Sequence, residues 1–128
     1  MKKQIVLTFT AAVLSFSLVQ AQGGFQRRTV EERVATVHQK LDSAMHLDAA
    51  KLTSADAIFT DYYKAQDKYR EDMMAAGGQP DRDAMRAKMT EMAGDRDAKL
   101  KAVFTDAQMT QWKNDIEPSL RPQRRPQQ

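Results

Sequence analysis

The stretch from Asp48 to Ala76, DAAKLTSADAIFTDYYKAQDKYREDMMAA, repeats its larger side chains at alternating spacings of three and four residues. This spacing places them on one face of an α-helix, as in a coiled coil. We call this face the seam; its members are Leu52, Ala55, Phe59, Tyr62, Gln66, Tyr69 and Met73. Asp48 can cap the helix, and the sequence GGQP at 77–80 ends it. The pattern predicts one long helix to about Ala76, roughly 40 Å in length at 1.5 Å per residue.

A second helix is predicted before this one. Thr29-Val-Glu-Glu32 is a capping box, in which the Thr29 hydroxyl accepts from the Glu32 amide and the Glu32 side chain reaches back. The apolar residues that follow have helical spacing, and they are Val30, Val34, Val37, Leu41 and Met45.

Two more helices are predicted after the glycines. Pro80 or Asp81 opens the first, whose inner face comprises Met85, Met89, Met92, Arg96, Leu100 and Val103. Thr105-Asp-Ala-Gln108 is another capping box, and Phe104 and Met109 around it match a hydrophobic staple. We expect this last helix to end at Pro118. With no strand pattern in the sequence, the predicted fold is all-α, with four helices of which the second and third are long.

The two ends of the chain differ from this helical part. Lys2 and Lys3 precede an apolar run from Ile5 to Val19, and Val19 and Ala21 supply the small residues of a cleavage site, as in a secretory signal peptide. We therefore expect cleavage after Ala21 and a periplasmic location, without a transmembrane segment in the mature chain. The expected organisation is a signal peptide at 1–21, a mobile leader at 22–28, a helical domain at 29–117 and a disordered tail rich in Pro, Arg and Gln at 118–128.

Composition narrows the classes of fold and partner. Residues 22–128 contain only twenty-five apolar side chains larger than alanine, which favours a thin, extended or oligomeric protein over a compact monomer. Between Thr29 and Leu120 acidic residues exceed basic ones by four, so a nucleic-acid-binding body is disfavoured. The chain has no cysteine, which excludes disulfides and thiol chemistry.

Two helix starts carry a resemblance to a known family. Phe104-Thr-Asp-Ala-Gln108 resembles the Leu-Thr-x-x-Gln signature of the Spy/CpxP family of periplasmic chaperones and envelope-stress proteins, with Phe in place of Leu. Leu47-Asp-Ala-Ala-Lys51 is a more divergent copy, with Asp for Thr and Lys for Gln. The motif residues are therefore Leu47, Asp48, Lys51, Phe104, Thr105 and Gln108. The resemblance covers about Thr29 to Glu117 and implies a thin, curved, antiparallel homodimer. In the best-studied members of the family such a dimer binds unfolded proteins without ATP, whereas other members sense envelope stress or bind metal.

Methionines and one tyrosine are the candidate client contacts. Methionine is flexible and polarizable, so it adapts to varied partners. The candidates are Tyr63, which lies off the seam, and Met73, Met74, Met85, Met89 and Met92. Two other interpretations of the methionines remain open, namely a helical core and a thioether site for Cu(I).

Histidine chemistry and catalysis have less support. His38 and His46 lie about two helical turns apart, roughly 12 Å along one helix, so one metal ion would need a ligand from elsewhere to join them. No P-loop, dinucleotide glycine pattern or nucleophile elbow is present, and we expect neither enzymatic activity nor a cofactor.

These patterns leave three functions. The first is an ATP-independent periplasmic chaperone or envelope-stress binding protein that captures unfolded clients on a helical dimer. The second is a metal-responsive protein for Cu or Zn with the same fold. The third is a structural helical module whose basic tail attaches to the envelope.

Overall fold

The computed structural model describes residues 27–121, and this part of the chain is all-helical with no strand. The expected signal peptide and most of the leader and tail lie outside the described residues. The helices are α1 (Val30–Met45), α2 (Ala49–Ala75), α3 (Arg82–Leu100), α4 (Asp106–Gln111), the π-helical turn η1 (Trp112–Ile116) and α5 (Glu117–Leu120). No described helix has a stretch long and apolar enough to cross a membrane.

The helix starts follow the capping chemistry that the sequence predicts. Thr29 and Glu32 form the reciprocal capping box of α1, and Thr105 and Gln108 form that of α4. Asp48 caps α2 by accepting a hydrogen bond from the Lys51 amide at 2.8 Å. These caps satisfy amides that a helix start otherwise leaves without a partner.

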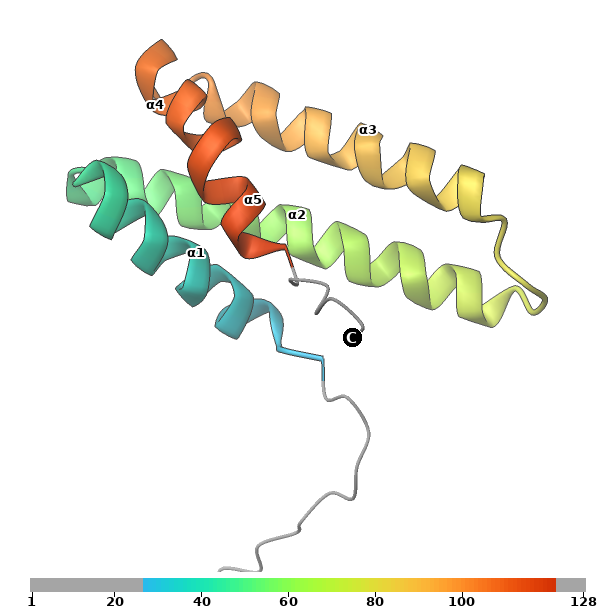
Figure 1. Ribbon diagram of the computed structural model, residues 1–128. Helices are drawn as coiled ribbons and strands as arrows, with labels where there is room; N and C mark the ends of the chain where they lie inside the picture. Colours follow the sequence, from blue (N-terminus) through green and yellow to red (C-terminus); the bar gives the residue numbers. More distant parts are fainter. Residues whose placement is uncertain (1–26, 122–128) are drawn as a thin grey trace, which may run out of the picture.

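The long helices α2 and α3 form an antiparallel hairpin, joined by a loop in which Gly77 and Gly78 both have positive φ. Figure 1 shows α1 and the segment α4–η1–α5, which we call the C-terminal segment, lying over one half of this hairpin. The other half, which ends at the glycine loop, extends beyond them. The hairpin therefore has a covered half and a projecting half.

The core lies under the covered half. Its buried side chains come from every long helix and from the C-terminal segment, and they are Val37, Leu41, Leu47, Leu52, Ala55, Phe59, Leu100, Phe104, Met109, Trp112 and Ile116. Leu47 with Leu52, and Phe104 with Met109, flank the two caps as hydrophobic staples do.

The C-terminal helix does not end at Pro118 as predicted. The Glu117 amide donates to the Trp112 carbonyl, which is the wider hydrogen bond of a π-turn, and helical backbone continues to Leu120. Proline has no amide hydrogen and crowds the preceding turn, so it disturbs an α-helix at this point. The π-turn next to it lets the chain stay helical with one widened turn.

Candidate functional site

A groove runs between α1, α2, α3 and the C-terminal segment, with a volume of about 1060 Å³. Its charged lining is almost entirely basic: nine cationic side chains face it and one carboxylate, that of Glu117. We call it the basic groove; its cations are Arg27, Arg28, Arg33, Lys40, Arg70, Arg86, Arg96, Lys113 and Arg121.

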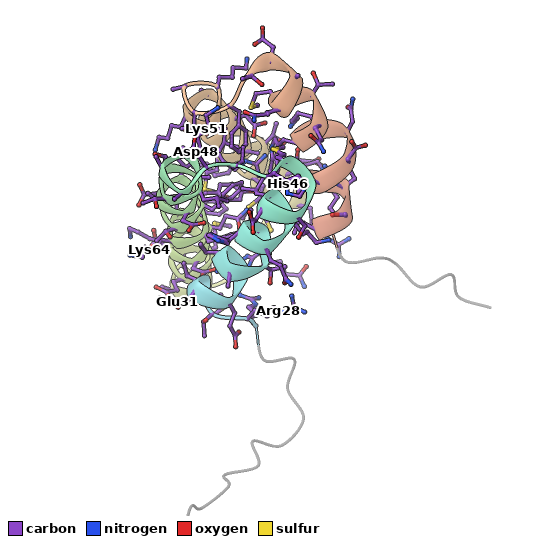
Figure 2. The ribbon with its side chains drawn as sticks, turned by 90° about the vertical axis from the view of Figure 1, so that its left-hand side faces the viewer. Arg28, Glu31, His46, Asp48, Lys51 and Lys64 are labelled. Atoms are coloured by element: carbon purple, nitrogen blue, oxygen red, sulfur yellow. The ribbon has the colours of Figure 1, made fainter. Side chains whose placement is uncertain are left out.

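Charge is therefore segregated between the groove and the rest of the surface. From Thr29 to Leu120, the residues that do not line the groove include 16 acidic and 7 basic side chains. Glu31 and Asp48, labelled in Figure 2, belong to this acidic remainder. The helical domain therefore has a net negative charge but a concentrated positive charge in the basic groove. Such a positive region attracts anions over several ångströms.

Two arginines and two tyrosines form a stacked row in the lining of the groove. The Arg33 guanidinium lies 4.5 Å from the centre of the Tyr63 ring, and that of Arg96 lies 4.7 Å from the centre of the Tyr62 ring. The two tyrosine rings are 5.2 Å apart. Burial raises the pKa of both phenols, against the lowering effect of the arginines. Cation–π attraction holds the row together.

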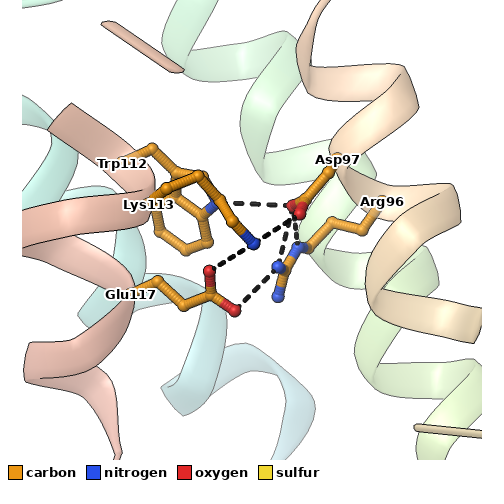
Figure 3. A network of polar contacts seen from close by, with 5 residues as sticks. All are labelled: Arg96, Asp97, Trp112, Lys113 and Glu117. Carbon is orange, nitrogen blue, oxygen red and sulfur yellow. Dashed lines mark hydrogen bonds and ion pairs between the residues drawn. The ribbon is translucent and has the colours of Figure 1, made fainter. Parts of the chain in front are cut away.

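Arg96 is the one charged residue in the buried set of the described chain, at 5% exposure. Its Nη2 donates to Asp97 at 2.8 Å and to Glu117 at 3.1 Å, and its Nε also donates to Asp97. Lys113 Nζ lies 2.8 Å from a carboxylate oxygen of each acid, and Trp112 Nε1 donates to Asp97. This Arg96 cluster, drawn in Figure 3, joins α3 to the C-terminal segment.

The electrostatics of the cluster favour its charged form. Burial raises the pKa of Asp97 and of Glu117, but hydrogen bonds from Lys113 and Arg96 outweigh it and hold both below their ordinary values. The pKa of Lys113 is raised in return, because Lys113 donates to both acids. The cluster is thus ionised at neutral pH, and it fixes one wall of the groove.

Several groove cations lack such partners. Arg33 is paired with Asp67, and Arg70 is 4.0 Å from the same carboxylate. Within the described chain the remaining cations form no ion pair, and they are Arg27, Arg28, Lys40, Arg86 and Arg121.

The methionine candidates divide between the core and the surface. Met92 is 9% exposed and belongs to the buried set. Met74 is 73% exposed, and Met73, Met85 and Met89 are half-buried. We call Met73, Met74, Met85 and Met89 the methionine face. All four lie on the projecting half of the hairpin, and Met89 also lines the basic groove.

The structure places the other candidates in packing roles. Tyr63, the candidate that lies off the seam, is half-buried and packs against the core beside Phe59 and under Arg33. The six motif residues form the two capped helix starts, with Leu47 and Phe104 buried beside the caps. None of the six lines the basic groove.

The histidines occupy separate sites. His38 Nδ1 lies 2.8 Å from Asp56 at a smaller groove of about 410 Å³ between α1 and α2. His46 ends α1 with φ 49°, in the left-handed region that usually requires glycine. Among the residues that the structure describes, no three His, Asp or Glu side chains are placed to hold a metal ion.

Sequence reasoning did not identify the basic groove. Its cations come from both ends of the described chain and from all three long helices, and no local spacing connects them. Arg96 at an inner position of its helix was the one available signal.

Comparison of the chain with protein-family models, curated proteins and solved structures gave no significant match. The resemblance to the Spy/CpxP family therefore stays a prediction from the motif residues.

Proposed function

We propose that this protein is an ATP-independent periplasmic chaperone or envelope-stress binding protein, which captures unfolded clients on the projecting half of the α2–α3 hairpin. The observation that carries the proposal is the change in burial along the seam. Leu52, Ala55 and Phe59 are buried by the rest of the chain, whereas the members from Tyr62 to Met73 are half-buried. The same apolar face continues past the point where the chain covers it.

The chemistry of this uncovered region suits varied partners. Methionine side chains repack at low cost and make favourable contacts with aromatic and aliphatic groups. Met74 is the exposed large apolar residue of the described chain. Covering an apolar side chain on a surface lowers the free energy, because its apolar area is removed from water. Dense mixed charge surrounds the face, including the Lys68–Asp72 and Lys88–Glu91 pairs. A polar rim of this kind keeps the uncovered face soluble and speeds encounter with clients.

An aggregation assay tests capture. A chemically denatured protein is diluted into buffer without ATP, and its light scattering is followed with and without the mature chain. The test variant replaces Met73, Met74 and Met85 by glutamine. The matched control places glutamine at Ala50, Ser54 and Ala57, which are exposed positions on the covered half of α2.

We expect the wild type and the control to suppress scattering at near-stoichiometric ratios, and the methionine variant to lose most of this activity at an unchanged melting temperature. No suppression by the wild type contradicts the proposed function. Equal suppression by all three proteins contradicts the assignment to the methionine face.

Homodimerisation is the second part of the proposal. Two projecting hairpins placed antiparallel would cover each other's seam at Tyr69, as two coiled-coil strands do, while Met74 and Met85 stay open to clients. Light scattering of the mature chain at micromolar concentration should then give twice the monomer mass. A strictly monomeric particle contradicts the dimer. Capture by a single hairpin is then decided by the aggregation assay alone.

A further inference from the structure

The basic groove presents more positive charge and more hydrogen-bond donors than the chain itself engages. Five of its nine cations have no ion-pair partner within the described residues, and the one lining carboxylate is held by Arg96 and Lys113. Like charges gathered in one concavity repel one another, so the free groove is destabilised by its own charge. An anion that enters it relieves this repulsion.

The lining of the groove adds directed donors to this charge. Arg96 uses Nε and Nη2 in its hydrogen bonds, and in the described chain its Nη1 donates to no protein acceptor. The hydroxyl groups of Tyr62 and Tyr63 make no hydrogen bond to described residues either, and both residues line the groove. A guanidinium and two phenols of this kind are donors for an oxyanion.

The pattern of charge selects among the anions. Seven of the nine cations are arginines, whose planar fork matches the oxygens of phosphate or carboxylate. They are distributed over α1, α2, α3 and both ends of the described chain, so a single small ion contacts only a few of them. A peptide advances about 3.3 Å per residue and carries charge on a fraction of its residues. A phosphate polymer carries charge on every unit and fits this density better.

Nucleic acid is less suited to the groove. Proteins that bind single strands without sequence preference stack bases on open aromatic rings. Here guanidinium groups lie over the Tyr62 and Tyr63 rings, and Trp112 is 1% exposed. The groove thus has the charge for a phosphate backbone but no free platform for bases.

We propose that the basic groove is a binding site for a flexible linear polyphosphate chain, held by the unpaired cations at its rim and by Arg96, Tyr62 and Tyr63 in its lining. The site is separate from the capture of clients, because its ligand is recognised by charge and the methionine face recognises apolar groups. The two surfaces adjoin, because Met89 of the methionine face and Tyr62 and Gln66 of the seam also line the groove.

Isothermal titration of the mature chain with polyphosphate of defined length tests this site. The groove variant replaces Lys40, Arg86 and Arg121 by glutamine, since none of these has an ion-pair partner in the described chain. The control replaces Lys51, Lys64 and Lys101 by glutamine. These lysines lie outside the groove, so the control loses the same three positive charges as the groove variant. Melting temperatures of both variants establish that they are folded. Inorganic phosphate, polyglutamate and single-stranded DNA serve as comparison ligands at equal charge concentration.

We expect polyphosphate to bind more tightly than each comparison ligand, with an affinity that falls as salt is raised. The groove variant should bind at least tenfold more weakly than the wild type, and the control within twofold of it. The variant at Met73, Met74 and Met85 should bind polyphosphate normally even if it fails to capture clients.

Three outcomes overturn the proposal. Equal weakening in the control shows attraction by net charge without a site. Polyglutamate or DNA binding as tightly as polyphosphate shows an acidic protein segment or a nucleic acid to be as good an occupant. Displacement of polyphosphate by an equal concentration of inorganic phosphate groups shows a site for a single ion.

Discussion

Replacing Arg96 by alanine removes the centre of the cluster that joins α3 to the C-terminal segment. The guanidinium is buried, donates to Asp97 and Glu117, and lies within 4.7 to 5.9 Å of the ring centres of Tyr62, Trp112 and Phe59. Breaking a buried ion pair by removing one partner costs about 3–5 kcal/mol, because the other charge loses its compensation. Lys113 still reaches both acids, so we expect Arg96→Ala to destabilise the protein by about 3 kcal/mol, at the lower end of this range.

Urea unfolding followed by fluorescence measures this loss. Trp112 is the single tryptophan and lies in the core beside the cluster, so its emission reports directly on this region. For a slope of about 1–2 kcal/mol per molar urea, the expected loss moves the midpoint by about 1.5–3 M. Arg86→Ala, which removes an exposed arginine of the same helix, should change stability by less than about 0.5 kcal/mol. An Arg96→Ala midpoint within 0.5 M of the wild type would refute the structural role of the cluster.

Further predictions concern the helix caps, the left-handed residue at the end of α1, and the stability of the protein at acidic pH. Phe104→Ala should cost about 3–5 kcal/mol, Thr105→Ala about 0.5–2 kcal/mol and Gln108→Ala least, in urea unfolding; loss of client capture at unchanged stability would instead make the motif a contact site. His46→Gly should raise stability by about 0.5–1 kcal/mol, since glycine adopts a positive φ without strain, and a lower melting temperature contradicts this. The folded pKa of Glu117 lies below its ordinary value of 4.5, so its contribution is complete at neutral pH and is lost as the pH falls below that value. The stability gap between the wild type and Glu117→Gln should therefore narrow from pH 7 to pH 3, and a constant gap contradicts the assigned pKa direction.

Local rules were enough to predict the helices. The capping boxes at Thr29 and Thr105 depend on residues three positions apart, and the seam depends on spacings of three and four, so both can be read along the chain. The buried position of Arg96 also followed from its spacing in the inner face of α3. These predictions are confirmed. They could be made from the sequence because each feature depends on residues that are near one another along the chain.

The remaining features depend on tertiary contacts or on backbone detail. The direction of Tyr63 is set by Arg33 of another helix, and the basic groove by cations from distant segments. The continuation past Pro118 requires a π-turn, and the end of α1 at His46 uses a positive φ for a residue other than glycine. Neither has a reliable signature in a single sequence.

Site-specific crosslinking tests capture of clients on the projecting hairpin most directly. A photo-reactive phenylalanine analogue is placed at Met74 in one protein and at Ala57, exposed on the covered half of α2, in another. Each is mixed with a denatured client without ATP and irradiated. We expect strong crosslinks to the client from position 74 and few from position 57. Equal yields from both positions, or crosslinks from position 57 alone, would contradict it.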